Sequence, residues 1–112
     1  MKYAMLIHYT PGDTDAMSDN EREAMLAEYL ALRDAPGYIA SAELQPIETA
    51  TTVRVQDGRT LTTDGPFADT KEVFGGYYVF EAGNLDDAIE LAARIPAARL
   101  GGAVEVRPVV EH

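Results

Sequence analysis

Six segments of the chain are rich in apolar or β-branched residues and predict strands. They are residues 2–9, 38–44, 51–56, 59–63, 73–82 and the alternating segment around Val104 and Val106. In residues 2–9 and 73–82 large apolar side chains fall on both alternating faces. We therefore expect these two strands to be buried on both faces.

Two other segments carry apolar residues at the spacing of a helix. In the first, which runs to about Asp34, Ser18 and Glu21 form a capping-box start, and the apolar stripe that follows predicts a helix lying on a core. In the second, Asn84 is a good N-cap, and the helix it begins ends near Pro96.

Turn signals separate these segments. Asp57-Gly58 suits a type I′ turn and predicts a hairpin between its flanking strands. Asp64-Gly65-Pro66-Phe67 turns the chain into the strand 73–82, and we expect Phe67 to anchor this loop in the core. Gly75-Gly76 indicates a bulge or a close approach of backbone.

The order of the elements predicts an α+β fold. A β-α-β unit, an inserted β-hairpin and a second β-α-β unit make a ferredoxin-like split βαβ with an antiparallel sheet and both helices on one face. The 112 residues suit one domain over 1–112. The uncovered face would be apolar, so we expect a homodimer in which two such faces pack together.

Charge and composition disfavour several classes of function. The formal charge of −10 should repel phosphate backbones and anionic membranes, so we expect neither direct nucleic-acid binding nor membrane binding. There is no cysteine, no secretory signal and no transmembrane run, which favours a cytoplasmic protein. No metal-ligand spacing or cofactor motif stands out, and we expect neither metal nor cofactor. The acidic residues between Asp13 and Glu28 are best explained as a helix-favouring, solvated cluster.

The segment Asp64-Gly65-Pro66-Phe67-Ala68-Asp69-Thr70-Lys71-Glu72, followed by Gly75-Gly76-Tyr77-Tyr78, resembles the YCII-related family, in the branch named after its DGPF motif. The opening residues 1–7, the segments 44–46 and 51–55, and the closing residues 96–108 are similar to it as well. The resemblance thus covers nearly the whole chain.

This resemblance implies a dimeric α+β barrel of ferredoxin-like subunits. The wider superfamily includes lactone isomerases and a dehydrochlorinase, and some DGPF proteins accompany extracytoplasmic-function sigma factors. Members with proposed chemistry have a His-Asp pair whose histidine lies on the first helix. Residues 21–34 of this chain contain no histidine, so that pair does not transfer directly.

Three residues are candidates for acid-base catalysis. His8, on a predicted central strand, is a candidate general base, although a strand histidine also serves as a simple hydrogen-bonding group. Asp64 either caps its turn or acts on a ligand, and the structural role is favoured. Lys71, one of two lysines, either contacts a ligand or forms a surface pair with Glu72.

Four further residues are candidates for ligand binding. Thr70 and Glu72 flank Lys71 in the same loop. Arg54 suits a carboxylate clamp, with pairing across the sheet as the alternative. Tyr78 is a candidate contact, although a core or interface aromatic is favoured.

Two hypotheses of different class follow. The first is an enzyme or enzyme-like protein that uses acid-base chemistry on a small metabolite of aromatic or lactone type. The alternative is a non-catalytic binding or regulatory partner protein, as sigma-factor-associated relatives suggest.

Overall fold

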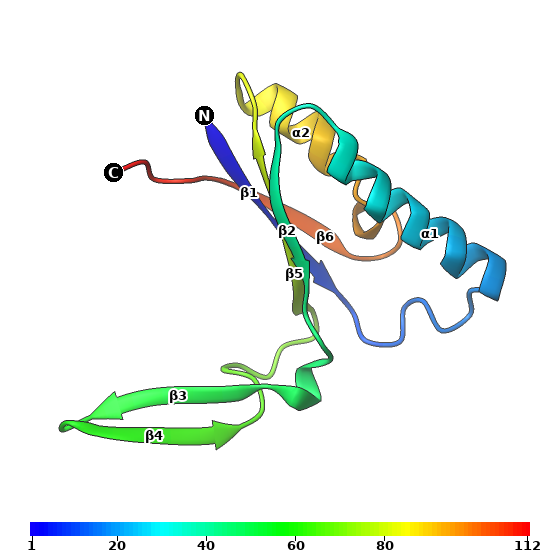
Figure 1. Cartoon of the computed structure of the whole chain (residues 1–112). Helices are drawn as coiled ribbons and strands as arrows, with labels where there is room; N and C mark the ends of the chain where they lie inside the picture. The colour runs from blue at the N-terminus through cyan, green and yellow to red at the C-terminus, as the bar shows by residue number, and fades with distance from the viewer.

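The computed structural model describes residues 1–112 and contains two antiparallel sheets and two α-helices. The larger sheet has the strand order β2-β5-β1-β6, formed by Tyr38–Glu43, Val73–Glu81, Lys2–Tyr9 and Ala103–Pro108. The smaller sheet is the hairpin β3-β4, formed by Thr51–Gln56 and Arg59–Asp64. The predicted ferredoxin-like split βαβ with an inserted hairpin is confirmed (Figure 1).

Both helices begin where the sequence predicts. In α1 (Asp19–Ala31) the Ser18 side chain accepts a hydrogen bond from the Glu21 backbone at 3.1 Å, and the Glu21 carboxylate accepts one from the Ser18 backbone at 3.3 Å. In α2 (Leu85–Ala93) the Asn84 side chain accepts from the Asp87 backbone at 2.9 Å. Both caps satisfy amide groups that a helix start leaves unpaired.

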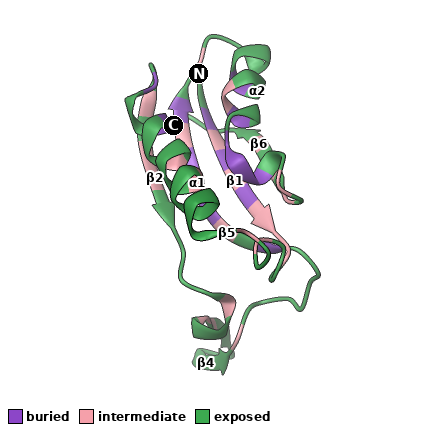
Figure 2. Ribbon diagram, turned by 90° about the vertical axis from the view of Figure 1, so that its right-hand side faces the viewer, coloured by how far each residue is buried: buried purple, intermediate pink, exposed green.

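The hydrophobic core lies between the larger sheet and the helices, on one face of the sheet (Figure 2). Met5 and Phe80 from the sheet and Ile95 after α2 are fully buried, each 0% exposed. On the neighbouring strands β1 and β5, core side chains face each other in register, Tyr3 opposite Phe80 and Met5 opposite Tyr78. The alternation of a strand sends every second side chain to this core.

The opposite face of the larger sheet has no helix over it, and we call it the uncovered face (Figure 1). Its side chains, in register across the strands, are Ala4, Leu6, His8, Ala40, Ala42, Phe74, Tyr77, Val79, Ala103, Glu105 and Arg107. Phe74 is 41% exposed, and Leu6 and Val79 are half-buried. The expectation that β1 and β5 are buried on both faces is therefore wrong for the single chain, since no part of this chain covers that face.

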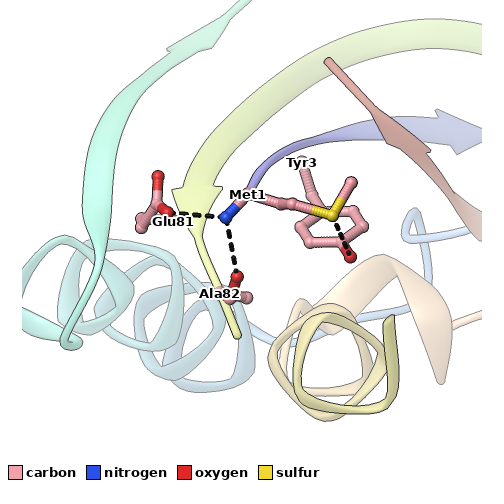
Figure 3. A network of polar contacts seen from close by, with 4 residues as sticks. All are labelled: Met1, Tyr3, Glu81 and Ala82. Carbon is pink, nitrogen blue, oxygen red and sulfur yellow. Dashed lines mark hydrogen bonds and ion pairs between the residues drawn. The ribbon is translucent and has the colours of Figure 1, made fainter. Parts of the chain in front are cut away.

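The start of β1 is tied to the end of β5. The amino group of Met1 donates to the Glu81 carboxylate at 2.7 Å and to the Ala82 carbonyl at 3.2 Å (Figure 3). The Tyr3 hydroxyl points to the Met1 sulfur at 3.7 Å. These contacts close the end of the β1-β5 pair that lies farthest from the hairpin.

The hairpin β3-β4, residues 51–64, projects from the body to the side of the larger sheet that faces away from the helices (Figure 1), and we call it the arm. The predicted turn is present, with Asp57 and Gly58 both at positive φ. None of its residues is buried. The segments that enter and leave the arm join it to the body (Figure 1).

Candidate functional site

A cavity of about 420 Å³ separates α1 from the larger sheet. Its walls include the apolar side chains of α1 at Met25, Leu26, Tyr29 and Leu30. No residue of α1 is buried, and Leu26 and Leu30 are 53% and 45% exposed. The predicted apolar stripe exists: Tyr29 packs against the core as expected, while Met25, Leu26 and Leu30 line the cavity.

The size and lining of this cavity suit a small organic ligand. Pockets for such ligands span about 300–1,000 Å³, with mostly apolar walls and a few polar groups that fix orientation. Here the polar lining comes from three sides: Asp13 after β1, Arg33 after α1, and Ser41 and Glu43 on β2. Carboxylates, a guanidinium and hydroxyl groups thus meet around one apolar space.

Two tyrosines connect α1 to the sheet at this cavity. The hydroxyl of Tyr78, on β5, donates to the backbone carbonyl of Tyr29, on α1, at 2.6 Å. Burial, with the neighbouring Tyr29, raises the pKa of Tyr78 to about 12. Its hydroxyl therefore stays protonated at neutral pH and donates the hydrogen bond that joins the helix to the sheet.

The phenol of Tyr29 itself lines the cavity. Burial is the main cause that raises its pKa, and the negative charges of Glu43 and Asp13 act in the same direction, while the Ala97 backbone and Arg99 oppose them. Tyr29 is therefore a neutral hydrogen-bond donor, near enough to two carboxylates for their charges to act on it. A neutral phenol can hold a ligand oxygen by a hydrogen bond, and carboxylates that line the same cavity can accept a proton from that ligand.

One wall of the cavity depends on a glycine, Gly75, because a side chain there would displace its neighbour. Tyr9 lies across Gly75, where an added Cβ would come within 2.6 Å of the Tyr9 ring. Gly75 stands where the register between β1 and β5 shifts, since Ile7 faces Gly76 and His8 faces Phe74. The predicted bulge and close approach at Gly75-Gly76 are both confirmed.

The predicted catalytic residues lie outside this cavity. His8 is on the uncovered face, with its Nε2 3.3 Å from a Glu105 carboxylate oxygen and its ring 5.8 Å from that of Phe74. Asp64 is the exposed last residue of the arm. Lys71 is exposed in the loop that follows. The three are not brought together in one pocket of the single chain, and their roles stay predictions.

The predicted ligand-binding residues divide between two places. Thr70 and Glu72 are exposed in the loop after the arm, where the Thr70 hydroxyl donates to the Glu72 carbonyl. Arg54 lies on the arm with its guanidinium carbon 5.3 Å from the centre of the Phe67 ring. Of the seven candidates Tyr78 alone lines the cavity.

Phe67 differs from its predicted place. It is 75% exposed and not a core anchor. The loop is instead held by backbone groups: the Gly65 amide donates to the Ala50 carbonyl at 2.8 Å, and the Thr52 hydroxyl donates to the Gly65 carbonyl at 2.8 Å. The DGPF turn therefore closes the base of the arm and presents its phenylalanine to the outside.

Reasoning from the sequence did not single out Asp13, Tyr29, Arg33 or Glu43. Asp13 was counted with the helix-favouring acidic cluster, and Tyr29 with an apolar stripe. A phenol inside an otherwise aliphatic stripe is the signal that was available, because a buried hydroxyl needs a partner or a ligand. Glu43 ends β2 on the same face as Tyr78, which strand pairing reveals and sequence alone does not.

No group of three or more His, Asp or Glu side chains is arranged to hold a metal ion. Neither helix has the length and apolar character that crossing a bilayer requires.

Fold and cavity together define an α+β protein with a split βαβ sheet and a ligand-sized space under its first helix. A model of the YCII-related domain matches residues 1–112. An uncharacterised protein of Rhizobium meliloti (strain 1021) is 34% identical over 114 residues, which cover 97% of this chain and 92% of that protein. The chain belongs to the YCII-related family.

A solved structure with a similar fold is 5-chloro-2-hydroxyhydroquinone dehydrochlorinase (TftG) from Burkholderia phenoliruptrix AC1100, in complex with 2,5-dihydroxybenzoquinone. The match has a TM-score of 0.55 at 18% identity and covers 100% of this chain and 96% of that one. At this identity the likeness concerns the fold.

Proposed function

We propose that this protein binds a small, ring-shaped, oxygen-bearing organic molecule in the cavity between α1 and the larger sheet and moves protons on it. The observation that carries the proposal is the cavity of about 420 Å³, with apolar walls and a neutral phenol close to carboxylates. An apolar cavity of about 150 Å³ already holds benzene, so a substituted ring fits this space. That a similarly folded dehydrochlorinase binds 2,5-dihydroxybenzoquinone supports this ligand class by analogy.

Four of the polar groups have a role in this proposal. Tyr29 donates a hydrogen bond to a ring oxygen, and Arg33 stabilises negative charge that develops on the ligand. Glu43 or Asp13 accepts the proton that the ring releases. The apolar side chains of α1 exclude water from the bound ring, which strengthens these interactions.

Ligand binding is tested by NMR titration with 2,5-dihydroxybenzoquinone as the probe. Leu30→Trp adds bulk on the wall of the cavity, whereas Leu85→Trp adds the same group on α2 outside it. We expect Leu30→Trp to weaken binding at least tenfold and Leu85→Trp to leave it within twofold. Equal affinity in both variants, or shifts confined to His8, Asp64 and Lys71, would place the site elsewhere.

Catalysis is tested separately, because binding alone also fits a non-enzymatic protein. Exchange of ring protons of the bound probe with deuterated water, followed by NMR, reports proton transfer directly. Glu43→Gln and Asp13→Asn, singly and together, should slow exchange while binding persists. His8→Ala and Asp64→Asn in the same assay show whether the residues predicted from the sequence take part.

We also propose that two chains pair through their uncovered faces. Leu6, Phe74 and Val79 form an apolar surface there that a single chain leaves in water. Light scattering at micromolar concentration should give twice the chain mass of 12.2 kDa. A mass of one chain would contradict the homodimer.

A further inference from the structure

The arm is the least covered part of the molecule. Figure 2 shows that the arm is mostly exposed. Val53 and Val55 are 59% and 67% exposed, and Leu61 is 43% exposed. A two-stranded hairpin without a third strand or a helix against it is marginally stable in water. The arm therefore needs a surface to pack on, and its own chain supplies none.

The two faces of the arm differ in chemistry. Register places Val53 opposite Thr62 and Val55 opposite Thr60, so these four uncharged, β-branched side chains share one face. The other face carries Arg54, Arg59 and Leu61, with Phe67 under the Arg54 guanidinium. Covering the valine face costs little desolvation, whereas covering the arginine face removes two cations from water.

The total surface of the chain is too large for a compact monomer. A monomer of this mass has an accessible surface of about 6,100 Å² by the usual scaling, whereas this chain exposes 7830 Å². Its radius of gyration is 16.0 Å, against about 13 Å for a compact domain of this length. Two chains together carry an excess of roughly 3,500 Å², which is within the range that stable homodimers bury.

Charge is compatible with a second copy as the partner of the arm. Arg54 and Arg59 balance Asp57 and Asp64, so the arm is neutral and the rest of the chain carries the formal charge of −10. Two bodies of this charge repel each other, while a neutral arm approaches an acidic body without that cost. The arm also extends on the side of the sheet where the uncovered face lies (Figure 1).

We propose that the arm is a dimer clamp: the valine face, Val53 and Val55 with Thr60 and Thr62, packs on the body of a second copy of this chain, and each copy clasps the other. This inference rests on the proposed homodimer and goes beyond it, because two uncovered faces can pair while both arms stay free. In this proposal the turn at residues 64–67 has a structural role, because its backbone hydrogen bonds fix the end of the arm that joins the body.

The clamp is tested with two matched pairs of lysine substitutions in the full chain. Val53→Lys/Val55→Lys places two cations on the valine face, and Gln56→Lys/Thr63→Lys places two on the opposite face of the same hairpin. All four positions lie on exposed strands of the arm, so the body should fold in both variants. By analytical ultracentrifugation we expect the dimer dissociation constant to rise at least tenfold in the first variant and less than threefold in the second.

Contact between the arm and the second copy is tested by photo-crosslinking. Because the chain has no cysteine, a single introduced cysteine can be labelled specifically. Val55→Cys and Gln56→Cys are each labelled with a benzophenone maleimide and irradiated. The clamp predicts a covalent dimer from position 55 and little from position 56. If both lysine variants still dimerise and neither label crosslinks, the clamp is wrong while the homodimer stands. If the parent chain is a monomer, both the clamp and the homodimer are wrong.

Discussion

Strands β1 and β5 and strands β3 and β4 form two antiparallel pairs with the same kind of hydrogen-bond ladder, yet only the first pair has a buried face. Met5 and Phe80 are completely covered, whereas every residue of β3 and β4 but Thr52 is exposed. A ladder satisfies backbone groups in both pairs. The difference shows that burial comes from what packs on the strands, and that the arm lacks such packing within one chain.

The side chains of the two pairs reflect this difference. β1 and β5 carry large apolar and aromatic residues, while β3 and β4 carry mainly Thr, Val and Arg. Both sets favour strands, because β-branched and aromatic residues suit a pleated surface. Only the first set brings enough apolar area to build a core. Strand propensity and core formation are therefore separate properties here.

The largest expected effect of a substitution lies in the buried pair. Phe80→Ala removes a fully buried ring and should lower the free energy of unfolding by about 3–5 kcal/mol. Val55→Ala, on the arm, should change it by less than about 0.5 kcal/mol at a concentration where the protein is monomeric. Urea denaturation of both variants checks this contrast. Similar losses in both would mean that the arm belongs to the cooperative unit of the body.

The next effect compares two glycines with positive φ, one in each region. Gly58, in the turn of the arm, has no atom within 4 Å of an added Cβ. Gly58→Ala should therefore destabilise the hairpin only through the strain of a positive φ, about 1–2 kcal/mol. In the body, a Cβ on Gly37 would lie 2.2 Å from the Glu81 carbonyl oxygen. Gly37→Ala must therefore move the end of β5 as well. Thermal unfolding should show a distinctly larger drop for Gly37→Ala than for Gly58→Ala.

Tyr78→Phe should cost about 1 kcal/mol, the net value of the hydrogen bond to the Tyr29 carbonyl. It should also change the dependence of stability on pH. An unfolded tyrosine has a pKa of about 10, whereas folding raises the pKa of Tyr78 to about 12. The stabilisation is therefore complete below pH 10 and is lost as the pH rises from 10 through 12.

Urea denaturation across this alkaline range measures the effect. The parent should lose stability steeply there, and Tyr78→Phe should show a shallower decline. Tyr77→Phe, on the next residue of β5 but on the uncovered face, is the matched control and should retain the steep decline. Parallel curves for the parent and Tyr78→Phe would remove Tyr78 as the source of the pH dependence.

The smallest expected effect lies on the arm. Arg54 over the Phe67 ring is an exposed cation–π pair, worth about 0.5–1 kcal/mol. Arg54→Ala should change the NMR chemical shifts of the Phe67 ring and leave the unfolding of the body unchanged. Arg54→Lys, which keeps a cation, should change these chemical shifts less. A marked loss of body stability in Arg54→Ala would contradict the separation of the two regions.

Much of the fold was predictable because it depends on local signals. Ser18 with Glu21, Asn84 and Asp57-Gly58 each act through nearby backbone groups, and all three lie where the sequence places them. The order of the elements along the chain predicted the split βαβ topology of the larger sheet. Local chemistry and chain topology were therefore sufficient for the architecture.

The site was not predictable in the same way. Periodicity along α1 shows which side of the helix is apolar, but the distance between helix and sheet depends on contacts such as the one between Tyr78 and Tyr29. Likewise, the apolar pattern of β5 shows that both faces avoid water, but not which of them the same chain covers. Phe67 was misplaced for this reason, since an aromatic residue suits a core and an interface equally well.

The packing of Tyr9 on Gly75 gives the cavity a simple means of changing its selectivity. Any residue with a side chain at position 75 would drive the Tyr9 ring out of its present position, because the two atoms nearest to an added Cβ are 2.6 and 2.7 Å away. Both residues line the cavity, so its shape would change with them. A single carbon atom at position 75 would therefore alter which molecules fit, while the opposite wall on α1 kept its sequence.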